Sequence, residues 1–181
     1  MIIIVMGVSG CGKTTIAKKL AEKLNWEFFE GDQYHPPENI ARMSHGVPLT
    51  DQDRAIWLTT LANLISDQLQ SNQQAVLACS ALKQKYRLQL AVDQRVRFVY
   101  LKVDQNSLLQ RLQQRGDHFM KPDMLVSQLL ALEEPADAIT LDANEEPEKI
   151  VEKVIMELFP SSDRKFHQTP APDHSHNSKK S

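Results

Sequence analysis

The sequence has few cysteines and no long apolar run. Its 181 residues include only Cys11 and Cys79, and neither is accompanied by residues spaced as metal ligands. Free thiols of this kind are typical of a reducing compartment. No apolar stretch approaches the roughly 20 residues that span a bilayer, and the apolar run at residues 1–6 is shorter than a signal-peptide core. We therefore expect a cytoplasmic protein without membrane association.

An excess of positive charge is also missing. The formal net charge is −2, from 21 basic and 23 acidic residues, and residues 160–181 hold four of the basic and two of the acidic side chains. The remaining chain thus carries 17 basic and 21 acidic side chains, a balance of −4. Such a surface does not suit nucleic-acid binding, so we expect no nucleic-acid partner.

Residues 160–181 lack the apolar residues that a core requires. Ser, Pro, His and Lys dominate there, and Phe166 is the one large apolar side chain. We predict a disordered polar tail, whose histidines are solvated rather than metal ligands. The whole chain is 41% hydrophobic, which suits a single α/β domain over residues 1–159.

A glycine-rich loop follows the first apolar run. Residues 7–14 read GVSGCGKT, and the preceding Ile-Ile-Ile-Val at residues 2–5 indicates a buried strand. The spacing matches the Walker A pattern GxxxxGK[ST]. Its glycines allow the positive φ angles at which successive amide N–H groups converge on phosphate oxygens. We predict that this loop binds ATP through the following residues: Gly7, Ser9, Gly10, Cys11, Gly12, Lys13, Thr14 and Thr15.

Two side chains of this loop have separate predicted roles. Lys13 directs a positive charge towards the β- and γ-phosphates, and Thr14 offers a hydroxyl to the Mg²⁺ that bridges them. A helix over residues 13–24 follows, with Ile16, Leu20 and Leu24 spaced four apart on one face. The dipole at the start of this helix favours the same negative charge.

Strand and helix patterns then alternate along the chain. We predict strands over residues 26–30, 75–79, 96–103 and 138–141, and helices over 53–69, 81–92, 105–115, 124–132 and from 147 onward. Repeated strand–helix units predict an α/β fold of the P-loop type, in which helices cover both faces of a five-stranded parallel sheet.

Two polar segments interrupt this alternation. Residues 31–54 contain three prolines and two glycines, and they follow the carboxyl end of a predicted strand, where ligands bind in doubly wound sheets. We interpret this segment as a long functional connection. Residues 116–123 separate two predicted helices and follow Arg111 and Arg115, which share a helix face. We predict a small helical lid there.

Several segments together resemble the gluconokinases, small P-loop kinases related in fold to shikimate kinase and the nucleoside monophosphate kinases. The resemblance extends from about residue 2 to residue 135 and rests on GVSGCGKT, GDQYHPPENIARM with HGVPLTDQDRAIWL, ACSALKQKYR, and RLQQRGDHFMKPDML with SQLLALEEP. The chain departs from the family pattern at Arg42, where Lys is usual, at Ile56, where Pro is usual, and at Leu88, where an acidic residue is usual. Leu88 weakens any requirement for an acid at that position.

The resemblance implies transfer of the γ-phosphoryl group of ATP to the 6-hydroxyl of D-gluconate, with Mg²⁺ as the metal. Gluconate carries one carboxylate and five hydroxyls, so its pocket should combine cations with hydrogen-bonding groups. Matching family positions supply the acceptor-binding candidates Asp32, His35, Arg54, Lys83 and Arg87. The resemblance also implies the catalytic candidates Lys13, Asp32, Arg111 and Arg115, the two arginines reaching the phosphates when a lid closes.

A carboxylate is missing at the end of the third predicted strand, where many P-loop enzymes have an Asp and this chain has Cys79 and Ser80. Asp32 is therefore the candidate that orients or deprotonates the acceptor hydroxyl, or that holds a water on Mg²⁺. Its alternative role is to cap a turn. We expect His45 and Tyr86 to be packing or rim residues and His118 to shape the lid.

Other readings stay open at this point. The acceptor could be shikimate or another small hydroxy acid, and the arginine and lysine candidates could be solvated helix faces. A non-catalytic nucleotide-binding module would use the loop without phosphoryl transfer. The adenine base should lie near residues 142–147, and a homodimer would fit related enzymes, although no heptad or exposed apolar stripe requires one.

Overall fold

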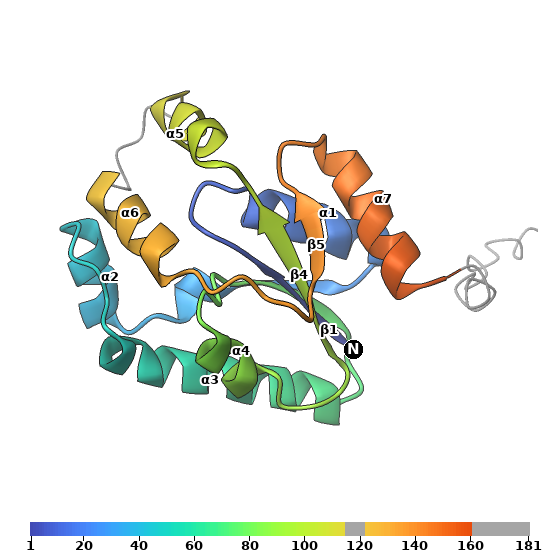
Figure 1. The fold of residues 1–181 in the computed structure, drawn as a ribbon. Coiled ribbons are helices and arrows are strands. Elements are labelled where there is room, and N and C mark those ends of the chain that lie inside the picture. The colour runs from blue at the N-terminus through green and yellow to red at the C-terminus, as the bar shows by residue number, and fades with distance from the viewer. Residues whose placement is uncertain (115–121, 161–181) are drawn as a thin grey trace, which may run out of the picture.

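The computed structural model describes residues 1–114 and 122–160 (Figure 1). Strands and helices alternate through most of this range, as the sequence pattern predicts. The strands are β1 Ile2–Met6, β2 Glu27–Glu30, β3 Ala75–Ala78, β4 Val96–Lys102 and β5 Ile139–Asp142. The helices are α1 Lys13–Leu24, the 3₁₀ turn η1 Gly31–Tyr34, α2 Pro37–Ser44, α3 Asp51–Gln70, α4 Gln84–Leu90, α5 Gln105–Gln114, α6 Pro122–Ala131 and α7 Pro147–Leu158.

Within the described residues, five strands form one parallel sheet in the order β2-β3-β1-β4-β5. Ile2 at the start of β1 pairs with Ala75 of β3 on one side and with Val96 of β4 on the other. The carboxyl ends of the strands therefore meet at one edge of the sheet. The predicted α/β fold with a five-stranded parallel sheet and helices on both faces is confirmed.

The side chains of β1 alternate between two apolar layers. Ile3 and Val5 point into the layer that includes α1 and α7 residues, whereas Ile2, Ile4 and Met6 point into the layer under α3 and α4. Figure 1 shows these helix pairs on opposite faces of the sheet. A central strand buried on both faces must be apolar throughout, which explains its uninterrupted run of aliphatic residues.

The interpretation of residues 31–54 as one long connection was wrong, because this segment contains η1, α2 and the first turn of α3. Pro37 stands in the first turn of α2, where a missing N–H costs nothing. Helix α3 begins two residues before its predicted start because Thr50 and Asp53 form a reciprocal capping box. Thr50 N donates to Asp53 Oδ2 at 2.7 Å, and Asp53 N donates to Thr50 Oγ1 at 3.2 Å.

Helix α4 is shorter than the predicted helix over 81–92. Ala81 has a φ of 43° and turns the chain after β3, so the helix starts only at Gln84, after Lys83 as N-cap. The predicted tail, apart from Pro160, and residues 116–121 of the lid predicted over 116–123 lie outside the described residues, whereas residues 122 and 123 begin α6. Among residues 1–114 and 122–160, no helix combines the length and apolar character of a membrane span.

Candidate active site

The phosphate loop between β1 and α1 has the backbone that its glycines predict. Gly7, Gly10 and Gly12 have φ angles of 141°, 85° and 103°. At Gly7, a Cβ atom would stand 2.9 Å from the backbone oxygen of Leu101, so a side chain is excluded by contact as well as by φ. Gly12 is the left-handed N-cap of α1, and it leads directly into Lys13. The loop therefore presents its amide groups at the start of a helix, where anions bind.

Lys13 and Thr14 contact different segments of the chain, the loop itself and the end of β2. Lys13 Nζ donates to the Val8 carbonyl at 3.1 Å, which folds the lysine side chain back along the loop. Thr14 is exposed, and its Oγ1 donates to Glu30 Oε2 at 2.7 Å. Thr15 is also exposed in the first turn of α1. An alcohol and a carboxylate oxygen thus lie together beside the predicted phosphate site.

Glu30 was missed by sequence reasoning, although it stands two residues before Asp32. It ends β2, and the parallel pairing of β2 with β3 brings it to the edge where α1 begins. The next residue, Gly31, lies so close to β3 that a Cβ atom there would stand 2.6 Å from the Ala78 oxygen. This tight approach explains why glycine separates the two carboxylates, and it delivers an exposed Asp32 to the same edge.

Glu30 and Gly31, the two residues before Asp32, lie beside the end of β3, because Glu30 pairs with Ala78 and Gly31 packs against Ala78 and Cys79. The pKa of the Cys79 thiol is raised to about 12, mainly by burial; a backbone hydrogen bond from Ala81 and the charge of Lys13 lower it, and the carboxylates of Asp32 and Glu30 raise it. Residues from three different segments therefore share one electrostatic environment. Because the thiol is buried and neutral at pH 7, Cys79 is a core side chain rather than a metal ligand.

His35 is packed rather than open to solvent. It is buried, and its ring stacks on Trp57 with a centroid distance of 4.2 Å and an interplanar angle of 15°. Burial lowers the pKa of His35, although the nearby Asp32 carboxylate raises it. Trp57 Nε1 donates to the Gly31 carbonyl at 2.8 Å. The stacked pair thus attaches η1, and with it Asp32, to α3.

A group of cations, Lys83 and Lys85 around Asp51, lies at the start of α3, beside the stacked pair, and is called the cationic corner below. Lys83 Nζ donates to both carboxylate oxygens of Asp51, at 2.8 and 3.1 Å, and Lys85 Nζ donates to Asp51 Oδ2 at 2.6 Å. The Tyr86 hydroxyl donates to the same carboxylate. These hydrogen bonds, led by that of Lys83, hold the pKa of Asp51 well below its usual range. The sequence predicted Asp51 as a polar residue near the start of this helix but did not predict its partners, because they lie more than 30 residues away in the chain.

Arg54 lies against this corner, and its environment differs from that of Arg87. Arg54 donates to the Leu49 carbonyl, and its guanidinium carbon stands 5.9 Å from the centroid of the Tyr86 ring. Tyr86 is itself buried, in agreement with the packing role expected for it. The structure thus brings Arg54 and Lys83 close to the same Tyr86 ring.

Arg87 does not join this group. It is 7% exposed, and its Nη1 donates to the carbonyls of Ala81 and Leu82 at 3.2 and 3.1 Å. These contacts hold the turn that precedes α4. A direct contact of Arg87 with the acceptor stays a prediction.

Arg111 reaches the phosphate loop from α5. Its Nη1 donates to the Cys11 carbonyl at 3.4 Å, and its Nη2 donates to the Ala143 carbonyl at 2.7 Å and to Asn144 Oδ1 at 3.1 Å. The guanidinium thus connects the loop to the segment after β5, where the adenine base is expected. Its predicted partner Arg115, like His118, lies outside the described residues.

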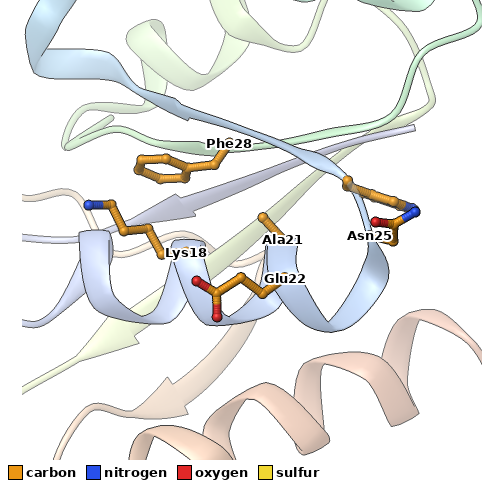
Figure 2. Close-up of a pocket in the computed structure, with 6 residues that line it drawn as sticks. Lys18, Ala21, Glu22, Asn25 and Phe28 are labelled. Atoms are coloured by element: carbon orange, nitrogen blue, oxygen red, sulfur yellow. The ribbon is translucent and has the colours of Figure 1, made fainter.

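A surface hollow between α1 and β2 lies apart from these residues (Figure 2). In it, Lys18 Nζ stands 5.5 Å from the centroid of the Phe28 ring, and Ala21, Glu22 and Asn25 line the floor and rim. None of the predicted site residues lines this hollow. We therefore place the candidate active site at the carboxyl edge of the sheet and not in this hollow.

Comparison with known proteins agrees with this arrangement. A family model described as shikimate kinase matches residues 9–159. A gluconokinase of Gluconobacter oxydans is 45% identical over 157 residues, which cover 84% of this chain and 88% of that protein. The crystal structure of a gluconokinase from Sinorhizobium meliloti superposes with a TM-score of 0.77 at 38% identity, covering 86% of this chain and 90% of that one.

A further solved structure extends this likeness. The crystal structure of a sugar kinase from Janibacter superposes with a TM-score of 0.82 at 41% identity, covering 87% of this chain and 93% of that one. The chain therefore belongs to the gluconokinase family, within the wider group of shikimate kinase-type P-loop kinases.

Proposed function

We propose that this protein is an ATP-dependent gluconokinase, which transfers the γ-phosphoryl group of ATP to the 6-hydroxyl of D-gluconate and releases 6-phospho-D-gluconate and ADP. The observation that carries the proposal is that the phosphate loop and Gly31, which precedes Asp32, both lie against the end of β3, with the cationic corner nearby: Gly7 N donates to the Ser80 carbonyl at 3.3 Å, and Gly31 packs against Ala78 and Cys79. The names of the relatives support gluconate as the acceptor.

The loop amides and Lys13 would hold the triphosphate. Mg²⁺ prefers oxygen ligands and is commonly bound by one or two carboxylates together with substrate phosphates and waters. Thr14 Oγ1 and Glu30 Oε2, which lie 2.7 Å apart, fit this preference. When bound, the ion would neutralise charge on the β- and γ-phosphates. Arg111, which already contacts the Cys11 carbonyl, would add positive charge on the opposite side of the loop.

The acceptor would lie between Asp32 and the cationic corner. We assign Lys83 and Arg54 to the carboxylate of gluconate, which leaves the far hydroxyl to point towards the phosphate loop. Asp32 would accept the proton of that hydroxyl as its oxygen forms the new bond to the γ-phosphorus and the bond to the β–γ bridging oxygen breaks. His35 and Arg87 would act through the elements they hold in place.

A panel of hydroxy acids tests the acceptor directly. Purified protein with ATP and Mg²⁺ is expected to convert D-gluconate at least about 100-fold more efficiently than shikimate, because a site built for one set of hydroxyls leaves polar groups unpaired with another. ADP release measures the rate with each acid, and the mass of the product shows which acid is phosphorylated. Preference for a different acid would contradict the proposal. Binding of ATP with no release of ADP in the presence of any acid would favour the non-catalytic module.

Glu30→Gln tests the proposed metal side. The amide keeps the size of the side chain and removes its charge, so we expect the Mg²⁺ concentration for half-maximal rate to rise by about tenfold or more. Titration of Mg²⁺ at saturating ATP measures this. Glu27→Gln is the matched control, because Glu27 is an exposed residue of the same strand. An unchanged Mg²⁺ requirement in Glu30→Gln would remove Glu30 from the metal site.

A further inference from the structure

Gln128 of α6 contacts the phosphate loop with both ends of its carboxamide. Ser9 N donates to Gln128 Oε1 at 2.7 Å, and Gln128 Nε2 donates to Ser9 Oγ at 3.1 Å. The two residues are 119 positions apart in the chain. Such a matched donor and acceptor pair fixes both the backbone and the side chain of Ser9 to α6.

Under the proposed function, Ser9 would lie at the end of the loop that serves the γ-phosphate. The side chain of Lys13, whose charge serves the β- and γ-phosphates in this type of loop, folds back to the carbonyl of Val8 at 3.1 Å. Val8 directly precedes Ser9. The amides near the start of α1 lie at the other end of the loop, so Gln128 contacts the loop where the transferred group would be.

The segment that follows α6 contacts the acceptor side. Glu133 N donates to the Leu82 carbonyl at 2.9 Å, and Gln84 N donates to Glu133 Oε2 at 2.6 Å. These contacts are made by the residues directly before and after Lys83, which belongs to the cationic corner. Helix α6 and its extension therefore join the γ-phosphate end of the loop to the acceptor segment, and Figure 1 shows α6 on this side of the sheet.

We propose that Gln128 is a positioning residue for phosphoryl transfer, which acts through Ser9 to set the γ-phosphate end of the loop and which must be neutral because the γ-phosphate lies next to it. This inference rests on the proposed kinase function. A glutamate at this position could keep both contacts, since the Ser9 hydroxyl can donate to it. It would, however, place a negative charge beside the third phosphate of ATP, which ADP lacks.

Gln128→Glu is therefore the decisive variant. We expect its Kd for ATP to rise by about tenfold while its Kd for ADP changes by less than about twofold, because like charges repel strongly at close range. Calorimetry with each nucleotide and Mg²⁺, without any acceptor, measures the ratio. Gln70→Glu is the control for the added charge. Gln70 is exposed at the end of α3, just before β3 starts, and so lies near the amino ends of the strands, away from the phosphate loop.

Gln128→Ala separates positioning from charge. It removes both contacts without adding charge, so we expect kcat to fall by about tenfold or more with the ATP-to-ADP affinity ratio unchanged. An ATP-to-ADP ratio in Gln128→Glu equal to that of the unmodified protein would overturn the proposal and leave Gln128 as a structural contact. Because the nucleotide measurement uses no acceptor, it stands even if gluconate is not the acceptor. A folding defect in Gln128→Ala leaves Gln128→Glu as the test.

Discussion

Replacing Lys13 with alanine is expected to lower kcat by about 10³-fold. The lysine charge lies inside the loop, where Nζ already stands 3.1 Å from the Val8 carbonyl, so it needs little rearrangement to reach a phosphate. A charge placed in advance stabilises the transferred group more than a solvent-exposed one can. Steady-state rates with ATP, Mg²⁺ and gluconate measure the loss.

Lys23→Ala is the matched control for this substitution. Lys23 is exposed in the last turn of the same helix, about 15 Å from Lys13 at the helical rise of 1.5 Å per residue. It carries the same charge and loses the same atoms, and we expect its kcat to stay within twofold of the starting value. A Lys13→Ala protein that folds normally and retains more than about a tenth of the rate would contradict the assignment of the loop.

Asp32→Asn is expected to lower kcat by about 10²- to 10⁴-fold while ATP still binds, as for the loss of a general base. The asparagine side chain has nearly the same shape, but its amide cannot accept the proton of the acceptor hydroxyl. The position of the residue should survive, because Gly31 and the Trp57 contact with the Gly31 carbonyl hold η1 in place independently of the carboxylate. Rates at saturating gluconate, together with the Kd for ATP, separate chemistry from binding.

Asp67→Asn provides the comparison for Asp32→Asn, because Asp67 is exposed on α3 and belongs to no part of the proposed site. We expect no change in its kcat. A near-normal kcat in Asp32→Asn would instead assign Asp32 to the alternative of a turn cap, and the acceptor proton would have to leave by another route. A loss confined to the KM for gluconate would make Asp32 an acceptor ligand without a role in proton transfer.

Part of the candidate site could be predicted because its determinants are neighbours in the chain. The spacing of Gly7, Gly12 and Lys13 reports directly on local backbone conformation, and the structure places these residues as expected. The contacts of Glu30 and Gln128 could not be predicted in this way. Each depends on a partner brought close by the sheet or by α6, at separations of 16 and 119 residues.

Exposure was harder to predict than chemistry. Arg87 has the charge of an acceptor ligand, but the left-handed turn at Ala81 draws its guanidinium to backbone carbonyls. His35 has the hydrogen-bonding groups of a sugar ligand, but stacking on Trp57 buries it. A one-residue change in backbone direction decides on which side of a helix or turn a side chain lies, and a sequence pattern does not contain that direction.

The sequence by itself determined the parallel α/β fold and the phosphate loop, since apolar periodicity and glycine spacing act over a few residues. Only the tertiary structure decided which carboxylate meets Thr14, which amide meets Ser9 and which cations gather on Asp51. These pairs form across strands and helices distant in the chain. They exist because the carboxyl ends of parallel strands are brought to one edge, and that arrangement is a property of the packed sheet.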